Sequence, residues 1–144
     1  MKLTLGVRTV NGTAGAAAWE ISTGATPGRA RLLELGFFLA AATASVYGLG
    51  RPAAIGTTPT TPVNFLPEDP NDVIAANVVL SALAWGVAPT VPAAYLRRIA
   101  LPATIGAGVI WTFPTGIVIP ASYGLVLWNI GTNGLVDAYA VLDI

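Results

Sequence analysis

The side chains that could do chemistry in this chain are its seven acidic residues, its seven basic residues and its four tryptophans. The 144 residues include no cysteine and no histidine. The chain therefore cannot supply a thiolate nucleophile, an imidazole base, a Ser-His-Asp triad or a metal site built on sulfur or imidazole. Carboxylate chemistry remains open to it, so the spacing of the acids is the next thing to consider.

The acids gather at one place, where Glu68, Asp69 and Asp72 surround Asn71. Calcium prefers several oxygen ligands, but this cluster lacks the spaced acids and the glycine of an EF-hand loop. A glycosidase would need two carboxylates facing each other across a cleft, and no spacing in the sequence indicates such a pair. We interpret the cluster as a solvated turn. We predict that the chain is not an enzyme and has no catalytic residue, cofactor or metal site.

Binding of nucleotides or nucleic acid is not indicated. The run Gly106-Ala107-Gly108 lacks the third glycine of a dinucleotide-binding loop, and no Gly-Lys-Ser/Thr occurs. Arg97-Arg98 is the only basic pair in a chain of zero net charge, and adjacent residues of a strand face opposite sides. We interpret this pair as solvated or ion-paired surface or, alternatively, as a contact between subunits, because arginine is enriched at interfaces.

The tryptophans have two possible roles. They could form a platform for carbohydrate, but aromatic residues more often fill a core or an interface, and we favour the latter. The residues concerned are Trp19, Trp85, Trp111 and Trp128.

Alternation of apolar and polar residues with a period of two is the main structural signal along the chain. It predicts strands at residues 3–7, 19–21, 99–101, 109–113, 125–128 and 136–142, and one long strand over 32–49. Turn signals separate these runs by about eight to twelve residues, which is typical of an all-β sandwich or barrel. The turn signals are Asn11-Gly12, Thr26-Pro27-Gly28, Pro114-Thr115-Gly116, Pro120-Ala121-Ser122 and Thr132-Asn133-Gly134. The alanine-rich segment from Ile74 to Ala84 is compatible with either a helix or a strand.

We predict a single β-sandwich domain over residues 1–144. The segment from Gly56 to Asp72 differs from the rest because four prolines in 17 residues exclude a helix or a central strand. We expect an extended Thr/Pro-rich loop that either lies on the surface or reaches as an arm over a neighbouring subunit, anchored by Phe65 and Leu66. Prolines and glycines also interrupt the longest uncharged stretch, 99–136, so we expect no membrane partner.

Three of the predicted strand segments are apolar on both faces. A two-layer sandwich buries one face of each strand, so the second face of these segments needs a cover. Because only 10% of the residues are charged, we expect another copy of the chain or a partner protein to provide it, with closed cyclic symmetry as the default. The segments are Leu35–Leu39, Ile117–Ile119 and Leu125–Trp128.

The C-terminal third resembles a known group of proteins. Its order is a strand ending in Val109-Ile110-Trp111-Thr112-Phe113, then Gly116-Ile117-Val118-Ile119-Pro120-Ala121, then Gly124 to Asn129 and a last strand from Leu135 to Ile144. This strand, "IPA" turn, strand and hairpin ending is similar to that of small jelly-roll virion proteins. It resembles most the head decoration (cement) or minor structural proteins of tailed bacteriophages, and similar endings occur in trimeric jelly rolls of the tumour-necrosis-factor type. The resemblance covers residues 96–144, with weaker support from 32–54.

The resemblance implies a jelly-roll sandwich that forms a homotrimer, binds the major capsid protein and reinforces the head lattice. It places the protein on the capsid surface of the virion after synthesis in the host cytoplasm, and it brings no catalytic residue with it. The residues we expect at such contacts are Phe65, Leu66, Arg97, Arg98 and Tyr123. The alternative is a carbohydrate- or receptor-binding jelly-roll module of a phage tail or a secreted protein.

Overall fold

The computed structural model describes residues 1–144 except 12, 14, 26–28 and 132–133. Within this described part the chain is all-β and contains no helix, as the alternating sequence pattern predicts. The strands are β1 (Lys2–Arg8), β2 (Ala16–Thr23), β3 (Ala30–Leu39), β4 (Ser45–Gly50), β5 (Thr57–Pro59), β6 (Leu66–Pro67), β7 (Val79–Ala82), β8 (Trp85–Val87), β9 (Tyr95–Leu101), β10 (Gly108–Ile119), β11 (Gly124–Gly131) and β12 (Val136–Asp143).

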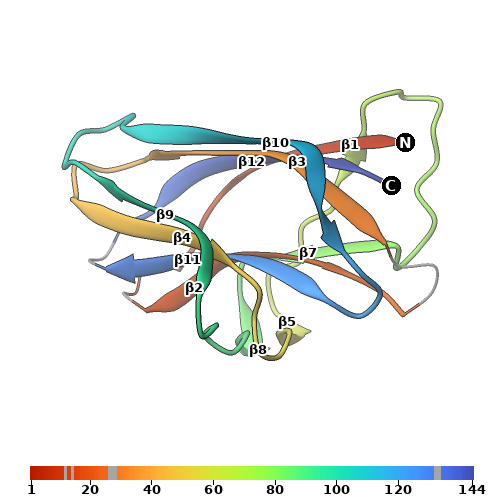
Figure 1. Cartoon of the computed structure of the whole chain (residues 1–144), viewed down its shortest axis with the longest axis horizontal. Helices are drawn as coiled ribbons and strands as arrows, with labels where there is room; N and C mark the ends of the chain where they lie inside the picture. The colour runs from red at the N-terminus through yellow and green to blue at the C-terminus, as the bar shows by residue number, and fades with distance from the viewer. Residues whose placement is uncertain (12, 14, 26–28, 132–133) are drawn as a thin grey trace.

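Two antiparallel sheets of five strands pack face to face as a β-sandwich (Figure 1). The first sheet has the order β10-β3-β12-β1-β6, and the second sheet has the order β7-β2-β11-β4-β9. A third, small sheet pairs β5 with β8. Successive strands therefore pass back and forth between the two large sheets, which brings the two ends of the chain together in β1 and β12.

The core fills the space between the two large sheets with the inward-facing residues of both. Phe37 lies at its centre, with its ring 5.5 Å from that of Tyr47 and 5.1 Å from that of Trp111. Two of the buried aromatic residues have hydrogen-bonded polar ends. The Tyr47 hydroxyl donates to the Gly134 carbonyl at 2.6 Å. In the same way the Trp19 indole N–H donates to the Ser81 hydroxyl at 2.6 Å.

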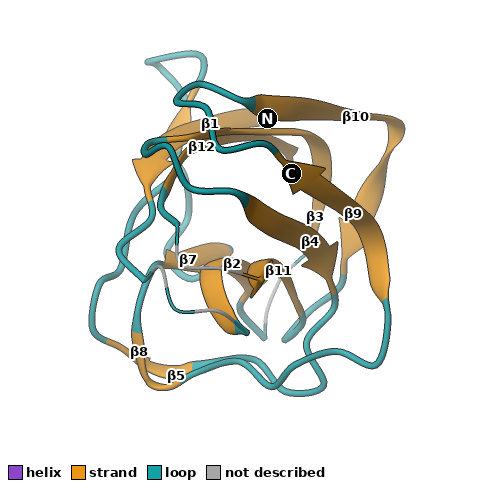
Figure 2. Cartoon of the chain, turned by 90° about the vertical axis from the view of Figure 1, so that its left-hand side faces the viewer, coloured by secondary structure: helices purple, strands orange, loops and turns teal. Residues whose placement is uncertain are grey.

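The long connection between β4 and β9, residues 51–94, closes one side of the sandwich. Its strand β6 pairs with β1 at the edge of the first sheet, and its strand β7 pairs with β2 at the edge of the second. Pro67 is compatible with β6 because an edge strand can spare the hydrogen bond that proline cannot donate. At the opposite side β9 and β10 remain free edges (Figure 2).

The same connection also covers the outer face of the second sheet. Strands β5 and β8 lie beyond β2 and β11, on the side away from the first sheet (Figure 1 and Figure 2). A small apolar cluster of Ala17, Val126 and Trp128 is buried there, with Trp85 and Tyr95 packed against it. The second apolar face of Leu125–Trp128 is thus covered within the chain, where we had expected a subunit or a partner.

The structure corrects the expected long strand over 32–49, which is two strands, β3 and β4, joined by residues 40–44. Its alternation is also broken. Leu142 pairs with Leu32 and Val141 with Glu34, so Leu33 is an extra residue, a β-bulge. The bulge places Leu32 in the core and leaves Leu33 half-buried.

Other segments differ in smaller ways from what the sequence pattern suggested. The Gly56–Asp72 segment, expected as one extended loop, contains the short strands β5 and β6 and a turn in which the Asp72 N–H donates to the Asp69 carbonyl. Ile74–Ala84 contributes the strand β7. The Pro114-Thr115-Gly116 signal is an irregularity within β10, where the pairing with β3 shifts, and Pro120-Ala121-Ser122 is the turn into β11. The signals at 11–12, 26–28 and 132–134 fall wholly or partly outside the described residues.

The contact between β10 and β3 is so close at Gly108 that it tolerates no side chain. A Cβ atom there would overlap the carbonyl oxygen of Phe37 and approach the Phe38 ring to 2.5 Å. We expect Gly108→Ala to lower the free energy of unfolding by about 1–3 kcal/mol in urea denaturation. Gly6→Ala is the matched control, since its Cβ would meet only the Ala138 oxygen at 4.0 Å. Equal effects of the two substitutions would contradict this account.

Candidate functional site

Glu20 is the buried charge of this fold. It lies on β2 between Trp19 and Ile21, whose side chains point into the core. Because side chains alternate along a strand, the Glu20 side chain points to the outer face of the second sheet, where the 51–94 connection covers it. Only 3% of the residue is exposed.

The Glu20 carboxylate accepts a hydrogen bond from the protein backbone. The Gly56 backbone N–H lies 3.2 Å from both Oε1 and Oε2. No basic side chain in the described part of the chain forms an ion pair with it. Burial raises the pKa of Glu20 to about 7, although the Gly56 N–H and the neighbouring Trp85 indole favour the charged form.

A pocket of about 350 Å³ adjoins the Glu20 carboxylate. Its polar lining includes Ser22, Thr57 and Asn64, and its apolar lining includes Ile55 and Leu80. Trp85 also lines it, and the buried indole N–H of Trp85 makes no hydrogen bond to any described residue. The arrangement can bind a small group that supplies hydrogen-bond donors. It offers no second carboxylate with which Glu20 could share acid–base catalysis.

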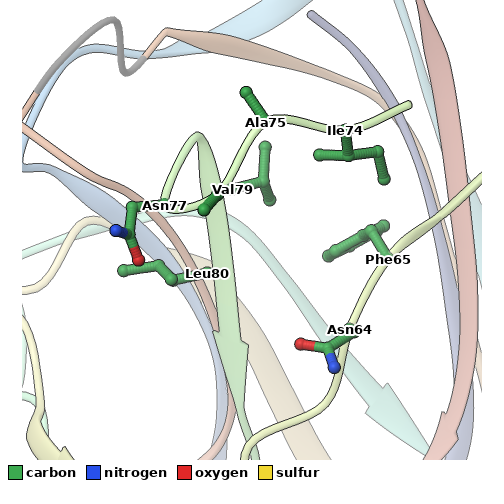
Figure 3. A pocket seen from close by; sticks show the side chains of 8 residues that line it. Asn64, Phe65, Ile74, Ala75, Asn77, Val79 and Leu80 are labelled. Carbon is green, nitrogen blue, oxygen red and sulfur yellow. The ribbon is translucent and has the colours of Figure 1, made fainter. Parts of the chain in front are cut away.

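A second pocket, of about 360 Å³, shares Asn64 and Leu80 with the first (Figure 3). Phe65, Ile74 and Val79 form its apolar part, and the amides of Asn64 and Asn77 supply its polar groups. It contains no ionisable side chain, so the pocket beside Glu20 is the better candidate for specific binding.

The five residues that we expected at contacts with other subunits or the capsid lie in different parts of the structure. Phe65 is 6% exposed and stacks on Trp19 with ring centroids 6.1 Å apart, so it belongs to the core of its own chain. Its neighbour Leu66 is 62% exposed on the edge strand β6. Arg97 and Arg98 are exposed on β9, at the opposite side of the sandwich. Tyr123 is exposed in the turn between β10 and β11.

The tryptophans do not form a common platform. Trp19 and Trp128 are each 1% exposed, and Trp111 packs with its edge against Phe37. Trp85 alone of the four lines the pocket beside Glu20. Glu20 was not among the residues expected at a site, although a lone acid in the otherwise apolar run Ala16–Ile21 is a signal for it.

Comparison with known protein families, curated proteins and solved structures finds no match for this chain. In the residues that the structure describes, no three acidic side chains gather where a metal ion could be held. No helix of sufficient length and apolar character to cross a membrane occurs in that part of the chain. The function therefore has to be argued from the fold, the surface and the Glu20 pocket.

Proposed function

We propose that this chain is a structural virion protein with a jelly-roll fold, a head decoration protein that binds the major capsid protein as a homotrimer. The observation that carries the proposal is the pairing of its eight strands of six or more residues. The first of them pairs with the last, β1 with β12, and the others follow inward as β2 with β11, β3 with β10 and β4 with β9.

This pairing describes one long antiparallel ribbon rolled into two sheets. Rolling the ribbon adds the contacts of β12 with β3 and of β11 with β4. Jelly rolls have eight strands in two sheets and occur in viral capsid proteins and in lectins. Together with the resemblance of residues 96–144, the pairing supports a place among the virion proteins.

We place the contacts between subunits on the side of the sandwich opposite the 51–94 connection. β9 and β10 are free edges there, and exposed edge strands invite pairing with another chain. This side carries Arg97, Arg98 and the exposed apolar residues Leu96 and Ile110. Arginine is enriched at protein interfaces, and exposed apolar residues favour burial against a partner.

Light scattering of the purified chain tests the proposal first. We expect a mass of three times 14.7 kDa, and we expect the trimer to sediment with phage heads and raise their melting temperature. R97E/R98E should raise the concentration needed for half-assembly by at least about tenfold. K2E/R29E, with the same change of net charge at exposed positions outside β9 and β10, should leave it unchanged. A monomer that fails to bind heads would overturn the proposal.

The pocket beside Glu20 favours the second candidate, a carbohydrate- or receptor-binding module. Trp85 lines it together with the hydroxyl groups of Ser22 and Thr57 and the amide of Asn64, a mixture of groups that can recognise a sugar. A shift of tryptophan fluorescence on titration with glycans, lost in Trp85→Phe, would support this function. The absence of a shift with every glycan tested would count against it.

A further inference from the structure

Among the described residues, Glu20 is the one aspartate, glutamate, lysine or arginine that is buried. No basic group of the described chain forms an ion pair with its carboxylate. An ionised carboxylate offers about four acceptor positions, and the protein donors beside it are the Gly56 N–H and the nearby Trp85 indole N–H. A buried charge is costly unless it is paired and hydrogen-bonded. The site therefore lacks a counter-charge that a ligand could bring.

The carboxylate can be reached from outside the molecule. It contributes to the lining of the 350 Å³ pocket, which also includes Thr57, Pro59, Asn64 and Leu80. These four residues are exposed, whereas Glu20 is not, so Glu20 lies at the inner end of the pocket. A ligand that enters between β5 and β7 therefore passes the exposed lining residues before it reaches the Glu20 carboxylate.

The lining selects the chemistry of the ligand. Ile55, Pro59, Pro62 and Leu80 present aliphatic surface along the pocket, which suits a hydrocarbon stem. The Trp85 side chain adds aromatic surface to the same lining. An anionic ligand would be repelled, and a divalent metal ion would find one carboxylate where it needs several oxygen ligands.

We propose that this pocket binds a primary ammonium or guanidinium group at the end of an aliphatic chain, of the kind found in lysine and arginine side chains. The stem lies along Ile55 and Leu80, and the cation pairs with the Glu20 carboxylate and donates the hydrogen bonds that it lacks. The Gly56 N–H remains in place and holds the carboxylate toward the pocket.

Calorimetric titration at pH 8 with Nα-acetyl-lysine amide, and in parallel with the norleucine analogue that lacks the ammonium group, tests the proposal. We expect the lysine derivative to bind at least about tenfold more tightly, because a charged hydrogen bond is strong in a buried site. The arginine derivative and n-butylammonium test a guanidinium group and a free amine. Binding of n-butylammonium with similar affinity would indicate a free amine as ligand, and much weaker binding would indicate a side chain of a partner protein.

Two variants separate binding from folding. Glu20→Gln should remove the preference for lysine over norleucine, and Leu80→Trp should block the pocket while the carboxylate stays in place. Carbon NMR of the Glu20 carboxyl in the wild type should show its pKa falling when the lysine derivative is added. Equal affinity for the lysine and norleucine derivatives, or an unchanged Glu20 titration, would overturn the proposal whatever the variants do.

Discussion

Replacing Phe65 by alanine should lower the free energy of unfolding by about 3–5 kcal/mol, the usual cost of removing a buried aromatic ring. The Phe65 ring is 6% exposed and stacks on Trp19 at an interplanar angle of 13°, so its removal leaves a cavity beside the largest core side chain. Urea denaturation followed by tryptophan fluorescence measures the effect directly, because Trp19 reports on this region.

The adjacent residue supplies the control for this experiment. Leu66 is 62% exposed, so Leu66→Ala should change the free energy of unfolding by no more than about 0.5 kcal/mol. If Phe65 instead anchored an arm on a neighbouring subunit, Phe65→Ala would weaken assembly and spare the stability of the monomer. That result would contradict the packing described above.

The stability of the protein should fall as the pH rises from about 5 to 8. The pKa of Glu20 is raised from 4.5 to about 7 by burial, so the folded state holds this proton more tightly than the unfolded state does. The contribution of Glu20 is therefore fully present below pH 4.5 and is lost as the pH passes through 7. The loss is on the order of 3 kcal/mol, from 1.36 kcal/mol for each pKa unit. Urea denaturation at pH 5, 6, 7 and 8 measures it.

Glu20→Gln should remove this dependence and make the protein more stable than the wild type at pH 8. Glu68→Gln, at an exposed position, is the matched control and should keep the wild-type profile. The ion pair of Arg8 with Asp137 lowers the pKa of Asp137, so that acid titrates at lower pH and does not disturb the measurement. A profile that rises with pH between 5 and 8 would contradict the burial of an unpaired Glu20.

Much of the local structure could be predicted from the sequence. The alternation at 109–113 and 136–142 lies within β10 and β12, because side chains that alternate in polarity suit a strand with one buried face. The apolar run 125–128 lies within β11, which is buried on both faces. Pro120-Ala121-Ser122 is the turn between β10 and β11. These features depend on residues that are neighbours in the sequence, and neighbouring residues can be compared without knowledge of the fold.

The bulge at Leu33, by contrast, depends on how β3 pairs with β10 and β12, and local alternation does not contain that pairing. One extra residue exchanges the faces of the strand, so Leu32 is buried in the core and Leu33 is half-buried. The same limit applies to Phe65 and Leu66, which are adjacent in the sequence and opposite in burial. The burial of Phe65 and the exposure of Leu66 follow from the pairing of β6 with β1, some 60 residues away in the sequence.

The sequence by itself determined the all-β class of the chain and the side-chain chemistry available to it, because residue types and local periodicity suffice for both. Only the tertiary structure decided that residues 51–94 cover the second sheet and that Glu20 lies buried beneath them. Burial results from contacts between segments far apart in the chain, here β2 and Gly56. The free energy of such a contact depends on both segments, so it cannot be derived from the local sequence of either one.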